Sequence, residues 1–224
     1  MLIRHRLHLG IAMASTFIGL QWSSLVGAAE WRAMRVRVNG ITIDLRTTES
    51  DLPREEIVRR VMAAWMAQGA VQPARLVSSE RTIIGRQRGV IHETVSIRAN
   101  AASGRVQIEY AAQDLTRARV TAARPPFVVP MGLRILQVTE FLDDPRTERQ
   151  FVLQMRRAPS VAAASLREAL RRSAWSVGTR ELRARGGAGG FVLSGERAGE
   201  RLEATVRAEE DGARIVLLVG GRAQ

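Results

Sequence analysis

Arg105-Val106-Gln107-Ile108 and Arg214-Ile215-Val216-Leu217 are the stretches that decide the fold, because the second repeats the first 109 positions later. Three more groups match at the same offset: Ile57, Val61 and Gly69 with Leu166, Leu170 and Gly178; Ile83, Ile84 and Arg88 with Val192, Leu193 and Arg197; Ile97-Arg98 with Val206-Arg207. One constant offset across a helix pattern and three strand patterns indicates an internal duplication.

The first copy has the pattern of one strand, one helix and three strands. Apolar and polar residues alternate over 41–45, which is strand periodicity. Ser50 or Asp51 caps a helix that begins near Pro53, has acidic residues in its first turn and ends at Gly69. Three strands follow, at 81–88, 92–99 and 104–111.

The second copy repeats this pattern, with a strand at 151–155, a helix introduced by Pro159-Ser160 and three strands at 191–196, 201–208 and 214–219. Such a unit buries one helix stripe on an antiparallel sheet. The sequence therefore predicts an α+β fold made of two duplicated two-layer modules, at 30–122 and 133–224. The proline-rich stretch at 123–132 reads as a linker, and residues 135–141 read as one further strand leading into the second module.

Residues 128–219 resemble small, uncharacterised extracytoplasmic domains of bacteria. Those domains place a Pro-x-Gly-Ala turn before the first strand and a Gly-Trp pair at the end of the helix. Here the corresponding segments are Pro130-Met131-Gly132-Leu133 and Ala174-Trp175, so the chain departs from the pattern at both places. The resemblance implies a domain that works outside the cytoplasm.

Residues 1–29 have the three parts of a secretory signal. Arg4 and Arg6 begin it, an uncharged apolar stretch covers 9–20, and the small residues of 26–29 precede Glu30. Cleavage after Ala28 or Ala29 would release the chain as a periplasmic or secreted protein. The alternative is an uncleaved signal that anchors the chain in the inner membrane, since the stretch 9–29 has about the 20 residues needed for a span.

The chain is strongly basic and lacks cysteine. All 34 basic residues are arginine, the formal net charge is +12, and about +10 remains without the leader. One interpretation is attraction to a polyanion such as lipid phosphate or nucleic acid. The other is a GC-rich base composition, which the even spread of the arginines favours. Without cysteine, stability has to come from buried apolar surface.

Few residues are available for catalysis. There is no lysine, and His92 is the one histidine after the leader, so the usual hydrolase and zinc sets are incomplete. The acidic clusters 143–144 and 209–211 lie at predicted turns, and the glycine run 186–190 precedes a strand rather than a helix. Trp65 and Trp175, at the helix ends, read as core. We predict no catalytic residue, no cofactor-binding residue, no metal ligand and no cofactor.

One asymmetry between the copies indicates a binding surface. Gln107 and Glu109 face outward in the first copy, whereas Val216 and Leu218 take the outward positions of the second. An apolar outer face is unusual for a sheet with one covered side, so we expect the first module, the linker or a partner protein to cover it. The sequence thus predicts a non-enzymatic envelope protein that acts as a binding or scaffold protein. Its predicted partner is another envelope protein, and the predicted partner-binding residues are Val216 and Leu218. The alternatives are a polyanion-binding protein that uses Arg98, Arg105, Arg207 and Arg214, and a small carboxylate-dependent hydrolase.

Overall fold

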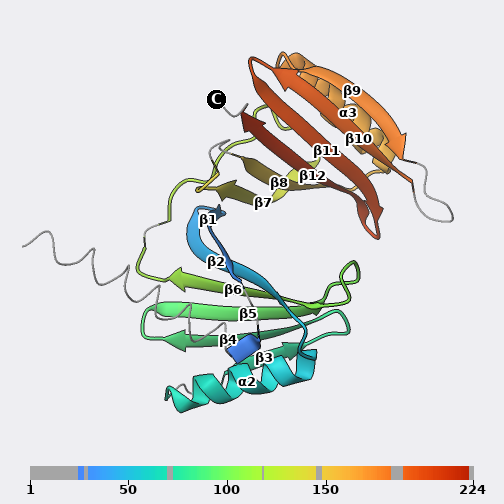
Figure 1. The fold of residues 1–224 in the computed structure, drawn as a ribbon. Helices are drawn as coiled ribbons and strands as arrows, with labels where there is room; N and C mark the ends of the chain where they lie inside the picture. The colour runs from blue at the N-terminus through green and yellow to red at the C-terminus, as the bar shows by residue number, and fades with distance from the viewer. Residues whose placement is uncertain are drawn as a thin grey trace, which may run out of the picture. The chain divides into compact units, whose positions relative to one another are not determined.

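Strands dominate the structure of this chain (Figure 1). A computed structural model describes residues 25–27, 30–69, 73–117, 119–144, 148–182 and 189–221. The first half contains β1 (Arg32–Val38), β2 (Ile41–Ser50), α2 (Arg54–Ala67), β3 (Ala74–Val77), β4 (Arg81–Arg88), β5 (Ile91–Ala99) and β6 (Val106–Asp114). The second half contains β7 (Leu133–Phe141), β8 (Arg149–Met155), α3 (Pro159–Arg172), β9 (Ser176–Leu182), β10 (Gly190–Arg197), β11 (Glu200–Glu209) and β12 (Gly212–Gly221).

The prediction of an α+β fold built from two duplicated two-layer modules is wrong. Within the described ranges there are twelve strands and two short helices, and the strands form one antiparallel hydrogen-bonded order, β3-β4-β5-β6-β2-β1-β7-β8-β12-β11-β10-β9. The expectation failed because it missed three strands, β1, β3 and β9. β3 and β9 carry mainly exposed side chains and show no clear alternation, so they resembled connections.

The other strands and both helices lie close to the positions predicted from the sequence. The predicted strands at 81–88, 92–99 and 201–208 correspond to β4, β5 and β11, and the further strand at 135–141 corresponds to β7. Both predicted helices are present as well. α2 starts after Pro53 with Glu55 and Glu56 in its first turn, and α3 starts at Pro159 and has two arginines in its last turn, both favourable to the helix dipole. Neither helix, nor any other in the described part of the chain, is long and apolar enough to span a membrane.

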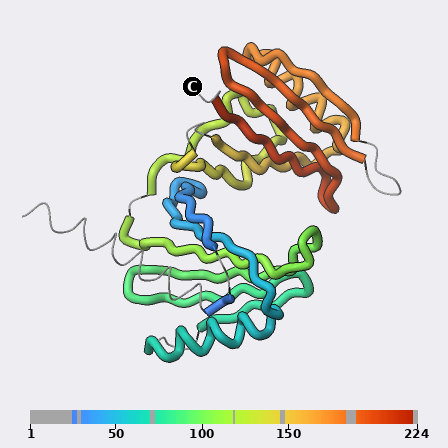
Figure 2. Tube along the Cα trace, viewed as in Figure 1, coloured from blue at the N-terminus to red at the C-terminus, as the bar shows by residue number. Residues whose placement is uncertain are grey.

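The described residues divide into two compact units (Figure 2). Unit 1 comprises the described residues up to Met34 together with 43–117, and in it α2 packs on β4 and β5. Its core is formed by the apolar faces of the helix and of three strands. The fully or almost fully buried members are Val26, Ile57, Val58, Val61, Trp65, Ile84, Val95, Ile97, Ile108 and Tyr110.

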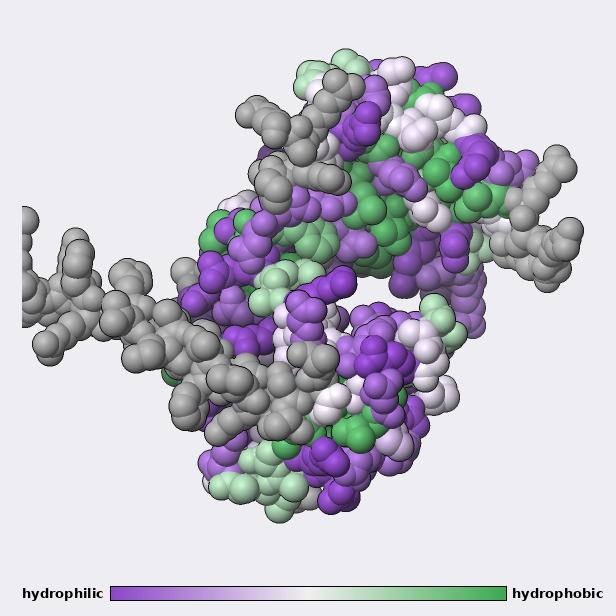
Figure 3. Space-filling view, in the orientation of Figure 1, coloured by the Kyte–Doolittle hydropathy of each residue, from purple (hydrophilic) through white to green (hydrophobic). Residues whose placement is uncertain are grey.

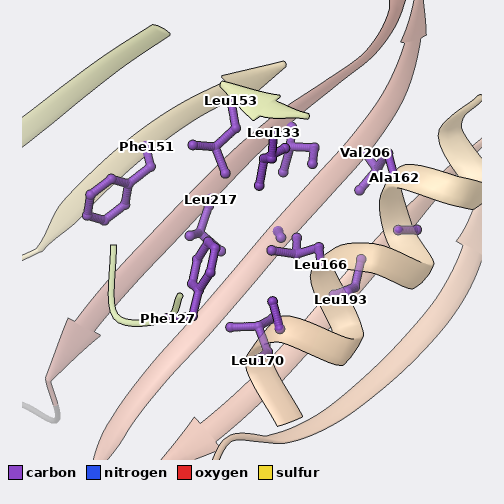
Figure 4. Close-up of a cluster of buried hydrophobic side chains, with 14 of the residues drawn as sticks. Phe127, Leu133, Phe151, Leu153, Ala162, Leu166, Leu170, Leu193, Val206 and Leu217 are labelled. Carbon is purple, nitrogen blue, oxygen red and sulfur yellow. The ribbon is translucent and has the colours of Figure 1, made fainter. Parts of the chain in front are cut away.

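Unit 2 comprises residues 35–42 and the described part of 118–224, and in it α3 packs on β9 to β12. Figure 4 shows its core, in which Leu166 and Leu170 of the helix face Leu193 and Leu217 of the sheet. Phe127, from the predicted linker, is buried in the same core, so this stretch is a part of unit 2. Residues 35–42 also belong to unit 2, because the end of β1, just before the Asn39-Gly40 turn, pairs with β7. The predicted domain limits at 30–122, 123–132 and 133–224 stay a prediction.

Candidate functional site

The candidate site is the sheet face of unit 2 that is opposite α3. Along β12, Ala213, Ile215, Leu217 and Val219 are fully buried on the helix side, and the residues between them point the other way. In Figure 1 this second face is turned toward the viewer and α3 lies behind the strands. We call it the open face and define it by the outward side chains of β8, β10, β11 and β12.

An apolar strip crosses the open face at the level of Val216. The strand register places Val216 directly between Thr205 of β11 and Val152 of β8, and Thr205 is in turn opposite Val192 of β10. Leu218 lies two residues further along β12. These valines and Leu218 are half-buried, and Figure 3 shows apolar side chains gathered over the sheet of unit 2 among polar ones. The strip therefore offers a site at which another molecule could bury apolar surface.

A row of arginines borders the strip on one side. Arg207 and Arg214 are directly opposite each other on β11 and β12, and the row continues through Gln154 to Arg134 on β7. Arg214 donates from Nε to Glu209, at 2.7 Å. Like charges directly opposite each other in a sheet are destabilising. This end of the open face is therefore basic and favours an acidic group on whatever binds there.

A hollow of about 890 Å³ borders the strip on its other side. It is lined by the strip residue Leu218 and by three glutamates, Glu148, Glu196 and Glu203, while Arg201 pairs with Glu196 at 3.3 Å. The open face is thus basic at one end, apolar in the middle and acidic at the other end.

The four arginines predicted to bind anions are divided between the two units. Arg207 and Arg214 share the open face of unit 2, but Arg98 and Arg105 belong to unit 1. Arg98 donates from Nε to Gln107 at 3.0 Å, and Arg105 donates from Nε to Asp51 at 2.8 Å. The charge of Arg105 is therefore already balanced within the chain.

A buried polar cluster in unit 1 was missed by the sequence reading. Arg86 of β4 lies 4.5 Å above the Trp65 ring and donates from Nε to Glu93 of β5 at 2.8 Å. The Tyr110 hydroxyl donates to the other Glu93 oxygen at 2.6 Å, and Gln68 accepts from Arg86 at 2.9 Å. Burial, together with the hydrogen bond to Glu93, raises the pKa of Tyr110 above its ordinary value. Each oxygen of Glu93 accepts a hydrogen bond from within unit 1, so the cluster is a closed hydrogen-bond network.

Unit 2 contains a similar cluster. Arg197 of β10 lies 4.7 Å above the Trp175 ring and pairs with Glu200 of β11 at 2.9 Å. In both units the arginine and glutamate are directly opposite each other across a hairpin. The predicted core position of Trp65 and Trp175 is confirmed, since both are almost fully buried. A signal existed in the sequence: Arg86 has the strand parity of buried Ile84, and Glu93 that of Val95.

The residues considered for catalysis are divided between the two units, with His92 in unit 1 and Asp143 and Glu209 in unit 2. His92 is half-buried in β5, opposite Gln87 and Gln113. Asp143 accepts a hydrogen bond from the Arg35 amide at 2.6 Å, and Glu209 pairs with Arg214. Gly186 and Gly187 of the glycine run lie outside the described residues. Among the described residues there is no group of three or more histidines and carboxylates arranged for a metal ion.

Comparison with known proteins identifies no family. No protein-family model and no curated protein matches the chain. Two solved structures align with it: the tesB protein of Mycobacterium avium subs paratuberculosis, at 9% identity over 88% of this chain and 97% of that chain, and the acyl-CoA thioesterase II TesB2 of Mycobacterium marinum, at 11% identity over 94% and 89%. Their TM-scores are 0.16 and 0.17, so neither alignment carries an argument about fold or activity. The resemblance of residues 128–219 to extracytoplasmic domains stays a prediction.

Proposed function

We propose that this chain is an exported, non-enzymatic envelope protein that binds another envelope protein through the open face of unit 2. The observation that carries the proposal is the half-buried strip of Val152, Val192 and Val216 beside Leu218, on the face opposite α3. The predicted linker does not cover this strip, because Phe127 packs into the core and the Pro126 carbonyl accepts a hydrogen bond from Trp175 at 3.3 Å. With the linker packed elsewhere, we propose a partner protein as the cover of this strip.

The charge distribution supports a protein partner more than a polyanion. A lipid or nucleic-acid phosphate surface would meet Arg207 at one end of the open face but would be repelled by Glu148 and Glu203 at the other. Two of the four predicted anion-binding arginines are paired with carboxylates, Arg105 with Asp51 and Arg214 with Glu209. The whole face is complemented by a protein segment that places acidic residues at the basic end, apolar residues on the strip and basic residues at the acidic end.

The test is capture of partners from envelope extract by the folded protein at low and high salt. The variant is Val216→Glu with Leu218→Glu, and the matched control is Ser160→Glu with Val161→Glu, which places the same two charges on the exposed first turn of α3. We expect wild type and control to retain the same partner at high salt, because burial of apolar surface does not depend on counterion release. The double variant should lose this partner. Leu218→Glu puts a carboxylate directly opposite Glu203 and should lower the unfolding midpoint, so capture is compared at a temperature at which all the proteins are folded.

Two results would count against the proposal. Retention of the partner by the folded double variant would show that the open face does not bind it. Capture that disappears steeply as salt increases, with nucleic acid or anionic vesicles competing for it, would instead favour the polyanion-binding alternative.

A further inference from the structure

Two residues near the C-terminal end of the predicted leader, Leu25 and Val26, pack into unit 1, and Gly27 beside them is exposed. Val26 is fully buried in the same cluster as Ile57, Val61 and Trp65, and its neighbour Leu25 packs against that cluster. Cleavage after Ala28 or Ala29 would remove all of Leu25, Val26 and Gly27 from the protein. Residues 1–24, Ala28 and Ala29 themselves lie outside the described residues.

Polar side chains of unit 1 hold this segment by its backbone. The Ser50 hydroxyl donates to the Val26 carbonyl, and Arg60 donates to the Leu25 carbonyl at 3.4 Å. Ser50 is fully buried, so without the segment its hydroxyl would lose the acceptor it has in this structure.

The backbone conformation of Gly27 and its closeness to Leu52 both favour glycine at this position. Its φ of +61° is a value that favours glycine, and a Cβ added there would lie 3.1 Å from a methyl group of Leu52. The segment therefore meets unit 1 through an apolar side chain, two backbone carbonyls and a glycine turn.

From these contacts we infer that Leu25–Gly27 remain in the folded protein, so that the bonds after Ala28 and Ala29 are not processed. A signal cleavage site has two small residues that are separated by one residue. The sequence just before Leu25, Gln21-Trp22-Ser23-Ser24, contains no such pair. This inference favours the uncleaved alternative, in which the leader would anchor the chain in the inner membrane. This inference does not depend on the proposed binding function.

One substitution separates retention from cleavage. Val26→Ala places a further small residue ahead of Gly27 and Ala28, so the changed segment suits a signal peptidase at least as well as the native one. The same change removes two methyl groups that are buried if the segment stays. The full chain would be exported in a bacterial host, and the melting temperature of the purified protein measured. The matched control is Val77→Ala in β3, whose side chain is 53% exposed.

We expect Val26→Ala to lower the melting temperature by about 4 to 8 °C and Val77→Ala to leave it unchanged. The intact mass of each folded protein should include Leu25–Gly27. A folded protein that begins at Ala29 or Glu30 would overturn the inference, as would an unchanged melting temperature for Val26→Ala. If Val26→Ala prevents folding altogether, the intact mass of the wild type still decides between the two outcomes.

Discussion

Replacing Glu93 by glutamine should destabilise unit 1 strongly. The side chain of Glu93 is 2% exposed and that of Arg86 is 5% exposed, with 2.8 Å between the paired atoms. Glutamine keeps the shape but leaves the Arg86 guanidinium buried without a counter-charge, which costs about 3–5 kcal/mol. Arg86 retains its hydrogen bond to Gln68 and its position above Trp65, so we expect the lower end, about 3 kcal/mol.

The assay is urea unfolding of the wild type and of Glu93→Gln, with the free energy of unfolding compared at an unchanged slope. Glu168→Gln is the matched control, because the pair of Glu168 with Arg172 on α3 has the same charges but is exposed, with side chains 56% and 73% accessible. We expect the control to lose less than about 0.5 kcal/mol. If the two variants lose equal free energy, burial does not make the Arg86–Glu93 pair important, and the reasoning is refuted.

Three other predictions concern single positions. Tyr110 is the chain's one tyrosine, and its raised pKa means that tyrosinate absorbance should be missing at about pH 10 in the folded protein. The contribution of Tyr110 to stability is constant below that pH and falls as the pH increases beyond it. A tyrosine that titrates at its ordinary pKa would contradict this. Gly212→Ala should lower the free energy of unfolding by at least about 2 kcal/mol, because its Cβ would clash with the Met155 carbonyl of β8. Gly199→Ala meets open space and should lower it by about 1 kcal/mol. Equal losses of stability in thermal unfolding would refute the difference. Arg207→Glu should stabilise unit 2 by a few tenths of a kcal/mol at low salt, because it ends the repulsion between Arg207 and Arg214. A loss of stability in the same unfolding assay would show that the two charges do not repel each other.

The local elements of this chain could be predicted because their patterns are strong. α3 combines an early proline with alanine and leucine at helical spacing, and β5 alternates polar residues with Val95 and Ile97. The outward positions of Val216 and Leu218 followed from the same alternation. These features depend on residues close together in the sequence.

The arrangement of the strands depends on contacts that a periodicity does not contain. The Asn39-Gly40 turn, where both residues have positive φ, joins β1 to β2, and the other edge of β1 pairs with β7, about 100 residues later in the chain. Asn-Gly is a strong hairpin signal and would have located this strand. β3 and β9 could not be recognised from alternation, because each pairs on one side only and keeps most of its side chains in solvent.

The candidate site was only partly predictable for a similar reason. The apolar residues of β12 were visible in one strand, but the arginine row and the acidic hollow combine residues from four or more strands. The register brings Arg134 of β7 into line with Arg207 of β11, although 73 positions separate them in the sequence.

Photo-crosslinking in intact cells tests the binding role of the open face most directly. A photoreactive phenylalanine would replace Leu218 in one variant and Val161, on the opposite side of unit 2, in another. The proposed function predicts a discrete crosslinked product with one envelope protein from position 218 and none from position 161. No product from position 218 in a folded, exported protein, or the same product from both positions, would contradict it.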